Sequence, residues 1–174
     1  RDQGLVTQDK KDSTGICFIG ERPFREFLAG YLPAQPGEMR TPEGDRVGTH
    51  QGLMYYTLGQ RQGLGIGGRK DGKESAWYVA GKEIDSNTLL VVQGEHPMLY
   101  SGGAEICQIN WIGTPPEQSQ LSAGLDCGVK VRYRQEDQRC TLCLTADDRL
   151  QIIFVSPQRA VAPGQYAVFY AGER

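Results

Sequence analysis

The sequence lacks the features that would mark a membrane protein, a secreted protein or a general polyanion binder. It has no apolar run of about 18 residues, so no transmembrane helix is expected. Residues 1–11 are polar and contain no signal-peptide core, which makes a cytoplasmic location the default expectation. The formal net charge is −2, so any nucleic-acid binding must come from a local basic face. The chain also does not begin with an initiator Met, which is consistent with an excised fragment.

Cysteine and histidine are scarce, with five and two residues. An odd number of cysteines without a secretory signal argues against a disulfide scaffold, and most are expected to be reduced and buried. Cys140 and Cys143 have the spacing of half a zinc site, but there is no second pair, and His50 and His96 are far away in the sequence. On a strand the two cysteines would point to opposite faces. The sequence therefore predicts no metal site.

Glycine and proline are abundant, with 23 and 9 residues, which predicts many turns and short strands. The expected fold is mainly β with a small α+β part. We expect residues 1–20 to form a mobile lead-in that carries a cysteine motif. Residues 21–96 are predicted to form a central α+β domain, and residues 97–174 a C-terminal antiparallel β-barrel whose last strand is truncated.

Periodicity and turn residues predict the individual elements. Residues 21–32 place their apolar side chains on one helical face. Residues 42–45 are expected to turn a hairpin, residues 54–58 to form a strand or a short helix, and residues 63–68 a glycine loop. Strands are predicted at 77–84 and 88–92, joined by a turn at 85–87, and then at 105–112, 127–134, 140–144, 150–154 and 166–170. Cys107, Cys127, Cys140 and Cys143 all fall in these strands, where packing explains them.

Cys17 lies in a turn-rich segment, Asp12-Ser13-Thr14-Gly15-Ile16-Cys17-Phe18-Ile19-Gly20, just before the predicted helix. The partial positive charge of a helix N-terminus favours a thiolate, which can attack, form a disulfide or carry a persulfide sulfur. From chemistry alone, a buried and inert cysteine is the more common outcome. The residue sequence of this segment favours the reactive cysteine over the inert one, because it resembles a known motif.

This segment resembles the second cysteine motif of the bacterial tRNA 2-thiouridylases. The resemblance continues in the same order through nearly the whole chain. It is carried by His50-Gln51-Gly52, Tyr56-Thr57-Leu58-Gly59-Gln60-Arg61, Gly63-Leu64-Gly65-Ile66-Gly67-Gly68, Trp77-Tyr78-Val79, Val131-Arg132-Tyr133-Arg134 and Ala162-Pro163-Gly164-Gln165-Tyr166-Ala167-Val168-Phe169-Tyr170. The family's N-terminal nucleotide-binding domain, with its first catalytic cysteine, is not part of this sequence, and the fragment alone is expected to be inactive.

The resemblance implies a sulfur-relay chemistry. ATP, with Mg, adenylates the C2 oxygen of the wobble uridine in the missing domain. A sulfur-carrier protein delivers sulfur to Cys17 as a persulfide, and the missing cysteine helps to release it onto C2 or forms a disulfide with Cys17. The expected substrates are tRNAs of the Lys, Glu and Gln type. No cofactor is expected in this fragment and no membrane contact.

A basic strand is the candidate RNA surface. Lys130, Arg132 and Arg134 alternate with packing residues, which on a strand sends three positive groups to one face. Such groups would contact phosphates, or they would simply form a solvated face. The resemblance implies that Arg132, Tyr133 and Gln165 contact tRNA. Because strict alternation separates Arg132 from Tyr133, one of them should lie at a bulge or strand end.

The glycine loop formally matches a dinucleotide-binding fingerprint, but the polar turn that follows it cannot open the required helix. The loop is either flexible or lies near the tRNA with Arg61 and Arg69 available to phosphates. Two other functions are alternatives to that of a tRNA 2-thiouridylase fragment. One is a non-catalytic RNA-binding β-barrel module, and the other is a structural domain whose Cys17 is inert.

Overall fold

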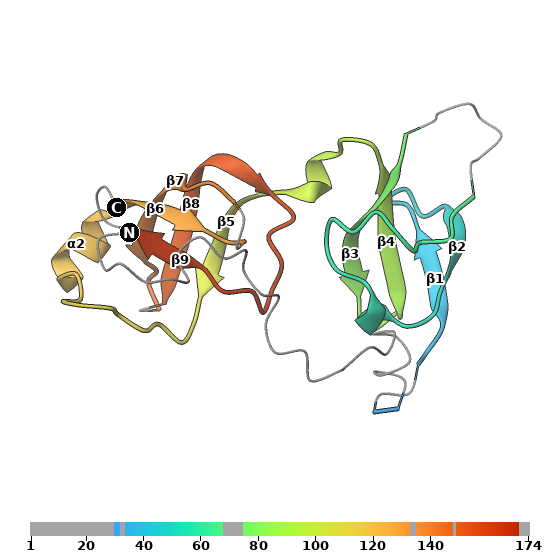
Figure 1. Ribbon diagram of the computed structural model, residues 1–174, viewed down its shortest axis with the longest axis horizontal. Helices are drawn as coiled ribbons and strands as arrows, with labels where there is room; N and C mark the ends of the chain where they lie inside the picture. Colours follow the sequence, from blue (N-terminus) through green and yellow to red (C-terminus); the bar gives the residue numbers. More distant parts are fainter. Residues whose placement is uncertain (1–29, 32–33, 68–74, 133–134, 148, 171–174) are drawn as a thin grey trace, which may run out of the picture. The chain divides into compact units, whose positions relative to one another are not determined.

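The computed structural model describes residues 30–31, 34–67, 75–132, 135–147 and 149–170 (Figure 1). Every helix and strand below lies in the compact unit Gln35–Arg174. The predicted lead-in and Cys17 lie outside the described residues, as does nearly all of the predicted helix over 21–32. Two sheets are present, which confirms the prediction of a mainly β fold. No helix among the described residues is long and apolar enough to cross a membrane.

The first sheet has four strands in the order β2-β1-β4-β3. They are β1 (Gly37–Arg40), β2 (Arg46–His50), β3 (Trp77–Glu83) and β4 (Thr88–Gln93). The hairpin predicted at 42–45 is confirmed, because Thr41 N donates to Asp45 O and Gly44 N donates to Thr41 O, both at 2.9 Å. The antiparallel pair β3–β4 is also as predicted, with its turn at 84–87. Parallel pairing of β1 with β4 joins the two hairpins.

The core of this sheet combines strand residues with side chains from the segment after β2. Of the two alternatives predicted for 54–58, the structure has the short helix, a 3-10 turn η1 (Leu53–Tyr55). The segment that follows contributes Tyr56 and Leu64, which are 3% and 6% exposed. These two side chains pack with Met39, Val79, Leu89 and Val91. The segment after η1, and not a helix, therefore covers this part of the sheet.

The second sheet has five strands in the order β5-β8-β7-β6-β9, and every pairing is antiparallel, as predicted. The strands are β5 (Tyr100–Ile106), β6 (Leu125–Lys130), β7 (Gln138–Leu144), β8 (Leu150–Arg159) and β9 (Val168–Tyr170). A 3-10 turn, η2 (Pro97–Leu99), precedes β5. The buried cluster on one face is Leu121, Val129, Val131, Cys140, Leu142, Leu150, Ile152 and Phe154. The boundary between domains at 96/97 stays a prediction.

The strand predicted over 105–112 is wrong in its bounds. Strand β5 starts at Tyr100, because Tyr100 already pairs with Arg159, and it ends at Ile106 opposite Leu150, the first residue of β8. Among the described residues no strand pairs with the chain beyond Ile106, and Cys107 is an exposed residue outside the sheet. Because the start of β5 pairs with the far end of β8, β8 is also longer than the predicted 150–154.

The sequence reading also missed a short helix, α2 (Gln118–Ala123). Glu117 and Gln120 form a reciprocal capping box, in which the Gln120 side chain accepts from Glu117 N at 2.9 Å. The helix places Leu121 in the core of the second sheet. Glutamate is not among the residues preferred at an N-cap, so the local capping signals in the sequence do not predict this helix.

Candidate functional site

Three of the residues predicted to contact RNA, Lys130, Arg132 and Gln165, lie at one end of the strand pair β6–β9. Lys130, the last residue of β6, pairs with Val168, the first residue of β9. Arg132 follows this end of β6 by two residues, and Gln165 precedes β9 by three, so both emerge at the same end of the pair. Both residues are exposed. Tyr133 and Arg134 lie outside the described residues, and Arg61 is exposed in the segment after η1.

The strand predicted over 127–134 is wrong at residues 131–132, because β6 ends at Lys130. A turn ends it, because Gln135 N donates to Arg132 O at 3.1 Å, and Val131 N donates to the Gln135 side chain at 3.2 Å. Lys130 and Arg132 therefore do not share a strand face. Arg132 lies just beyond the end of β6. A bulge or a strand end was the position predicted for either Arg132 or Tyr133.

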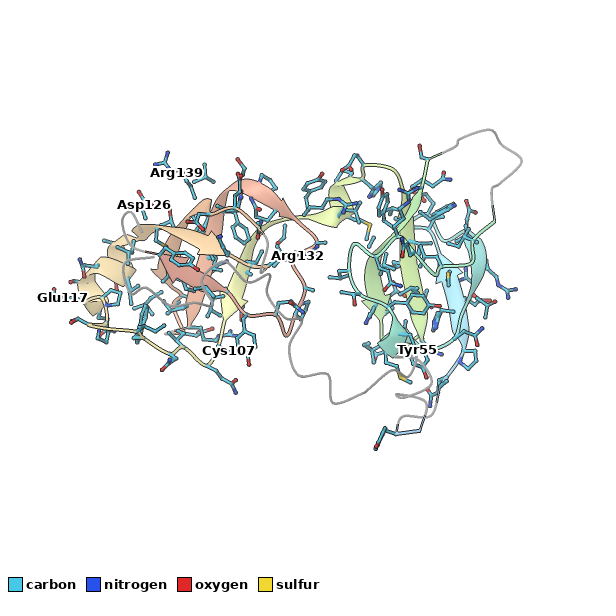
Figure 2. All side chains as sticks on the ribbon, in the orientation of Figure 1. Tyr55, Cys107, Glu117, Asp126, Arg132 and Arg139 are labelled. Carbon is cyan, nitrogen blue, oxygen red and sulfur yellow. The ribbon has the colours of Figure 1, made fainter. Side chains whose placement is uncertain are left out.

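The two basic residues differ in how their charge is compensated. The Lys130 ammonium lies 3.5 Å from the Asp137 carboxylate. Within the described part of the chain, Arg132 has no carboxylate at ion-pair distance, and its Nη2 donates to the Ala160 carbonyl at 3.0 Å (Figure 2). Arg132 is therefore held in place by the main chain while its positive charge stays available to a ligand.

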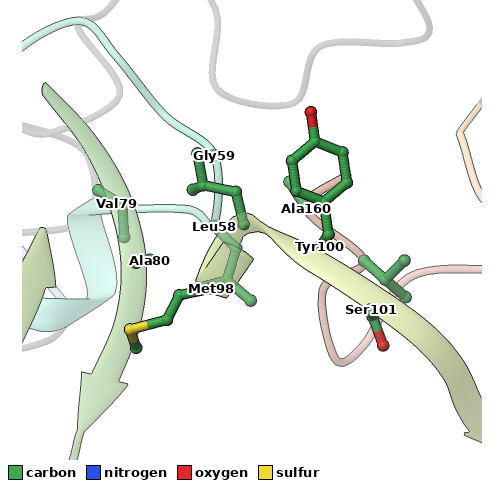
Figure 3. A pocket seen from close by; sticks show the side chains of 10 residues that line it. Leu58, Gly59, Val79, Ala80, Met98, Tyr100, Ser101 and Ala160 are labelled. Carbon is green, nitrogen blue, oxygen red and sulfur yellow. The ribbon is translucent and has the colours of Figure 1, made fainter. Parts of the chain in front are cut away.

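Ala160 connects this turn to the first sheet. Its N–H donates to Leu99 O at 2.6 Å, and its φ is +56°. Its methyl group faces Gly59, where a Cβ would come within 2.5 Å of the Ala160 Cβ (Figure 3). Gly59 itself has a φ of +77° and donates to Val79 O at 2.8 Å. Both the close approach and the backbone conformation require glycine at this position.

Arg159 also lies at this junction, and the sequence reading missed it. Its guanidinium carbon lies 4.6 Å from the centre of the Tyr78 ring, a cation–π contact. Its Nε is 4.0 Å from a Glu95 carboxylate oxygen, and the other oxygen accepts from Tyr100 OH at 2.5 Å. This hydrogen bond to Glu95 raises the pKa of Tyr100. No local sequence signal connects Arg159 with Tyr78, because their contact depends on the tertiary fold.

A small cavity lies beside this junction (Figure 3). Its volume is about 50 Å³, and its lining is mostly apolar, including Leu58, Val79, Met98 and Val161. A water molecule occupies about 30 Å³ in the liquid, so the cavity is too small for a nucleotide. It is a packing feature and no substrate pocket.

The described cysteines divide into one exposed residue and three in strands. Cys127 and Cys140 are cross-strand partners with their sulfur atoms 3.6 Å apart. Burial raises the pKa of the Cys127 thiol, and burial together with the neighbouring Cys127 raises that of Cys140 to about 12. Cys143 points away from the core and contacts the Gln151 carbonyl at 3.7 Å, so Cys140 and Cys143 lie on opposite faces, as predicted. Packing accounts for the cysteines in strands, whereas exposed Cys107 departs from that prediction.

The two histidines have structural contacts. His50 is fully buried, with Nδ1 accepting from Gly52 N and Nε2 contacting Asn87 O, both at 3.0 Å. These partners fix a neutral tautomer in which Nε2 carries the proton. His96 caps η2 through Nδ1, which accepts from Met98 N at 3.2 Å. Among the described residues, no three histidine, cysteine or acidic side chains are grouped so that they could hold a metal ion.

Comparisons with known proteins match the chain in two segments. Residues 25–93 match the family model described as tRNA methyl transferase PRC-barrel domain, and residues 101–174 match the aminomethyltransferase beta-barrel domain. A protein of Salmonella arizonae named tRNA-specific 2-thiouridylase MnmA is 58% identical over 99% of this chain and 46% of its own length. Proteins of the same name from Aeromonas hydrophila and Shigella boydii are each 57% identical, over 97% and 99% of this chain and 45% and 46% of their own lengths. The chain thus spans about half the length of these curated relatives.

Proposed function

Because this chain belongs to the tRNA-specific 2-thiouridylase family, we propose that it is the part of a tRNA-uridine 2-sulfurtransferase that carries the persulfide cysteine and a tRNA-binding surface. The observation that carries the proposal is the 58% identity over 99% of the chain, which takes in the Cys17 motif and the segments around Arg132 and Gln165. The substrate is the wobble uridine of tRNA, of the Lys, Glu and Gln type. In this proposal ATP and Mg bind outside this chain.

In this function the Cys17 thiolate attacks the terminal sulfur of a persulfide on a carrier protein, the carrier's own sulfur leaves as a thiolate, and Cys17 holds the transferred sulfur as a persulfide. The terminal sulfur attacks C2 of the uridine, whose oxygen has been activated by adenylation and leaves with AMP. A second cysteine thiolate, outside this chain, then attacks the Cys17 sulfur, so that the S–S bond breaks and a cysteine disulfide forms. The reaction leaves the sulfur on C2. The raised pKa values of Cys127 and Cys140 fit packing and not this nucleophilic role.

The test of the sulfur role is the Cys17→Ser substitution in a full-length protein that carries this sequence. We expect thiolation of tRNA to be abolished and tRNA binding to stay close to that of the parent. Cys107→Ser is the matched control, because Cys107 is the exposed cysteine among the described residues and should tolerate the change. Thiolation that survives in Cys17→Ser would refute the role of Cys17 and favour a non-catalytic RNA-binding module.

The geometry supports Arg132 and Gln165 as RNA contacts more strongly than Lys130. Arg132 and Gln165 emerge at the same strand end, and Arg132 is exposed with no carboxylate at ion-pair distance in the described ranges, while Lys130 is paired with Asp137. A chain with a net charge of −2 has no general attraction for RNA, so the binding must be local and sensitive to salt.

We expect Arg132→Gln to weaken tRNA binding and to reduce the slope of log affinity against log salt by about 0.7–0.9, which corresponds to one lost phosphate contact. Arg149→Gln is the control, since it removes the same charge from a guanidinium already paired with Glu105 and Asp147. The measurement is a titration of labelled tRNA at several salt concentrations. Coincident curves for Arg132→Gln and the parent would show that the RNA contact lies elsewhere.

A further inference from the structure

Two guanidinium groups converge on the contact between Gly59 and Ala160. The position of a Cβ on Gly59 lies 3.8 Å from Nη2 of Arg132 and 3.7 Å from Nη1 of Arg159. Arg132 comes from the turn after β6, and Arg159 is the last residue of β8. Two positive groups therefore flank one closely packed point of the main chain, although they are distant in sequence.

Negative charge at this point is low. Arg132 has no carboxylate at ion-pair distance within the described ranges. Among the described residues, the carboxylate at ion-pair distance from Arg159 is that of Glu95, at 4.0 Å, and Glu95 also accepts the hydrogen bond from Tyr100. The buried Nε of Arg159 has no hydrogen-bond acceptor in the described part of the chain. Two like charges that approach the same point repel each other, and an anion bound to both would offset that repulsion.

The surroundings hold both groups in place before any ligand arrives. The Ala160 carbonyl orients the Arg132 guanidinium, and the Tyr78 ring supports one face of the Arg159 guanidinium. Gly59 and Ala160 fill the point that the two groups flank, so a ligand would contact both guanidinium groups from the solvent side. Planar donors held in this way are suited to phosphate, which accepts hydrogen bonds on several oxygens.

We propose that Arg159 and Arg132 together bind one phosphate group of the RNA backbone. This inference rests on the proposed function and adds Arg159 to its RNA surface. The site takes a phosphodiester and reads no base, because guanidinium contacts to phosphate carry no sequence information. It places the RNA backbone at the junction of the two sheets, where main-chain hydrogen bonds fix the turn at Ala160.

The test compares tRNA binding by the parent chain, Arg159→Gln, Arg132→Gln, the double variant and the control Arg149→Gln across a series of salt concentrations. We expect Arg159→Gln to bind about tenfold more weakly, as for one lost charge-assisted hydrogen bond. Its salt slope should fall by about 0.7–0.9. The double variant should lose little more slope than either single variant, because both groups hold the same phosphate. Arg159→Lys keeps the charge and should recover most of the slope.

A rival role for Arg159 is that of a brace between β8 and Tyr78. Urea unfolding of the same variants separates the two roles. A lower stability of Arg159→Gln with an unchanged salt slope would overturn the phosphate site, and so would a double variant that loses two full contacts. A competition experiment with inorganic phosphate shows whether the site binds free phosphate or the phosphate of an RNA backbone. Equal displacement of tRNA by millimolar inorganic phosphate would mean a site for free phosphate and would overturn the assignment to RNA.

The outcomes also separate this inference from the proposed function. A parent chain that does not bind tRNA would overturn both. A parent that binds tRNA, with an effect of Arg132→Gln and none of Arg159→Gln, would overturn only the inference about Arg159.

Discussion

Replacing His50 with phenylalanine should destabilise the first sheet by about 2–6 kcal/mol. The side chain is fully buried, and its ring meets the Tyr56 ring edge-on at 6.0 Å between centroids. Phenylalanine keeps a ring of similar size but cannot accept from Gly52 N or donate to Asn87 O, each now 3.0 Å from a ring nitrogen. Each buried polar group left without a partner costs about 1–3 kcal/mol, which gives the expected total.

Urea unfolding followed by tryptophan fluorescence measures this loss, since Trp77 packs against the core of the first sheet. With a slope of about 2 kcal/mol per molar urea, the midpoint should fall by roughly 1–3 M. The control His96→Phe removes one hydrogen bond to Met98 N at an exposed site and should cost about 1 kcal/mol or less. If His50→Phe unfolds within about 0.5 kcal/mol of the parent, the two hydrogen bonds do not stabilise the sheet, and the reasoning is refuted.

Two further substitutions and one chemical probe test other parts of the structure. Gly59→Ala should cost more than about 2 kcal/mol, because its φ is +77° and its Cβ would meet Ala160, whereas Gly67→Ala, in open space, should be close to neutral in the same unfolding assay. At pH 8, about one in ten thousand Cys140 thiols is ionised at a pKa of about 12, so mass spectrometry should find iodoacetamide on exposed Cys107 long before Cys140. Because folding raises this pKa from 9.0, the stabilising effect of the neutral thiol is complete below about pH 9 and is lost as the pH rises towards 12, and Cys140→Ala should flatten that decline in unfolding free energy.

Local patterns predicted those elements whose partners are near in sequence. The turn at 42–45 and the β3–β4 hairpin follow from turn residues between two apolar segments, and both pairings are present. Strand bounds were less accurate where a distant strand supplies the partner. Strand β5 begins at Tyr100 because β8 extends to Arg159, and nothing near Tyr100 in the sequence records that pairing.

The candidate site shows the same division. Arg132 and Gln165 were predicted as RNA contacts from the family resemblance, and the strand alternation around Arg132 already required an irregularity there. The turn closed by Gln135 is that irregularity. Arg159 could not be found from the sequence, because its contacts with Tyr78 and Glu95 and its approach to Arg132 arise only when the two sheets are folded.

Trapping the persulfide on Cys17 tests the central proposal most directly. A full-length protein carrying this sequence would be incubated with a sulfur-donor system, alkylated and digested, and the Cys17 peptide analysed by mass spectrometry. We predict that this peptide carries one additional sulfur atom, and that this sulfur atom is lost from the peptide when tRNA and ATP are added. An unmodified Cys17 in a preparation that still thiolates tRNA would contradict the account.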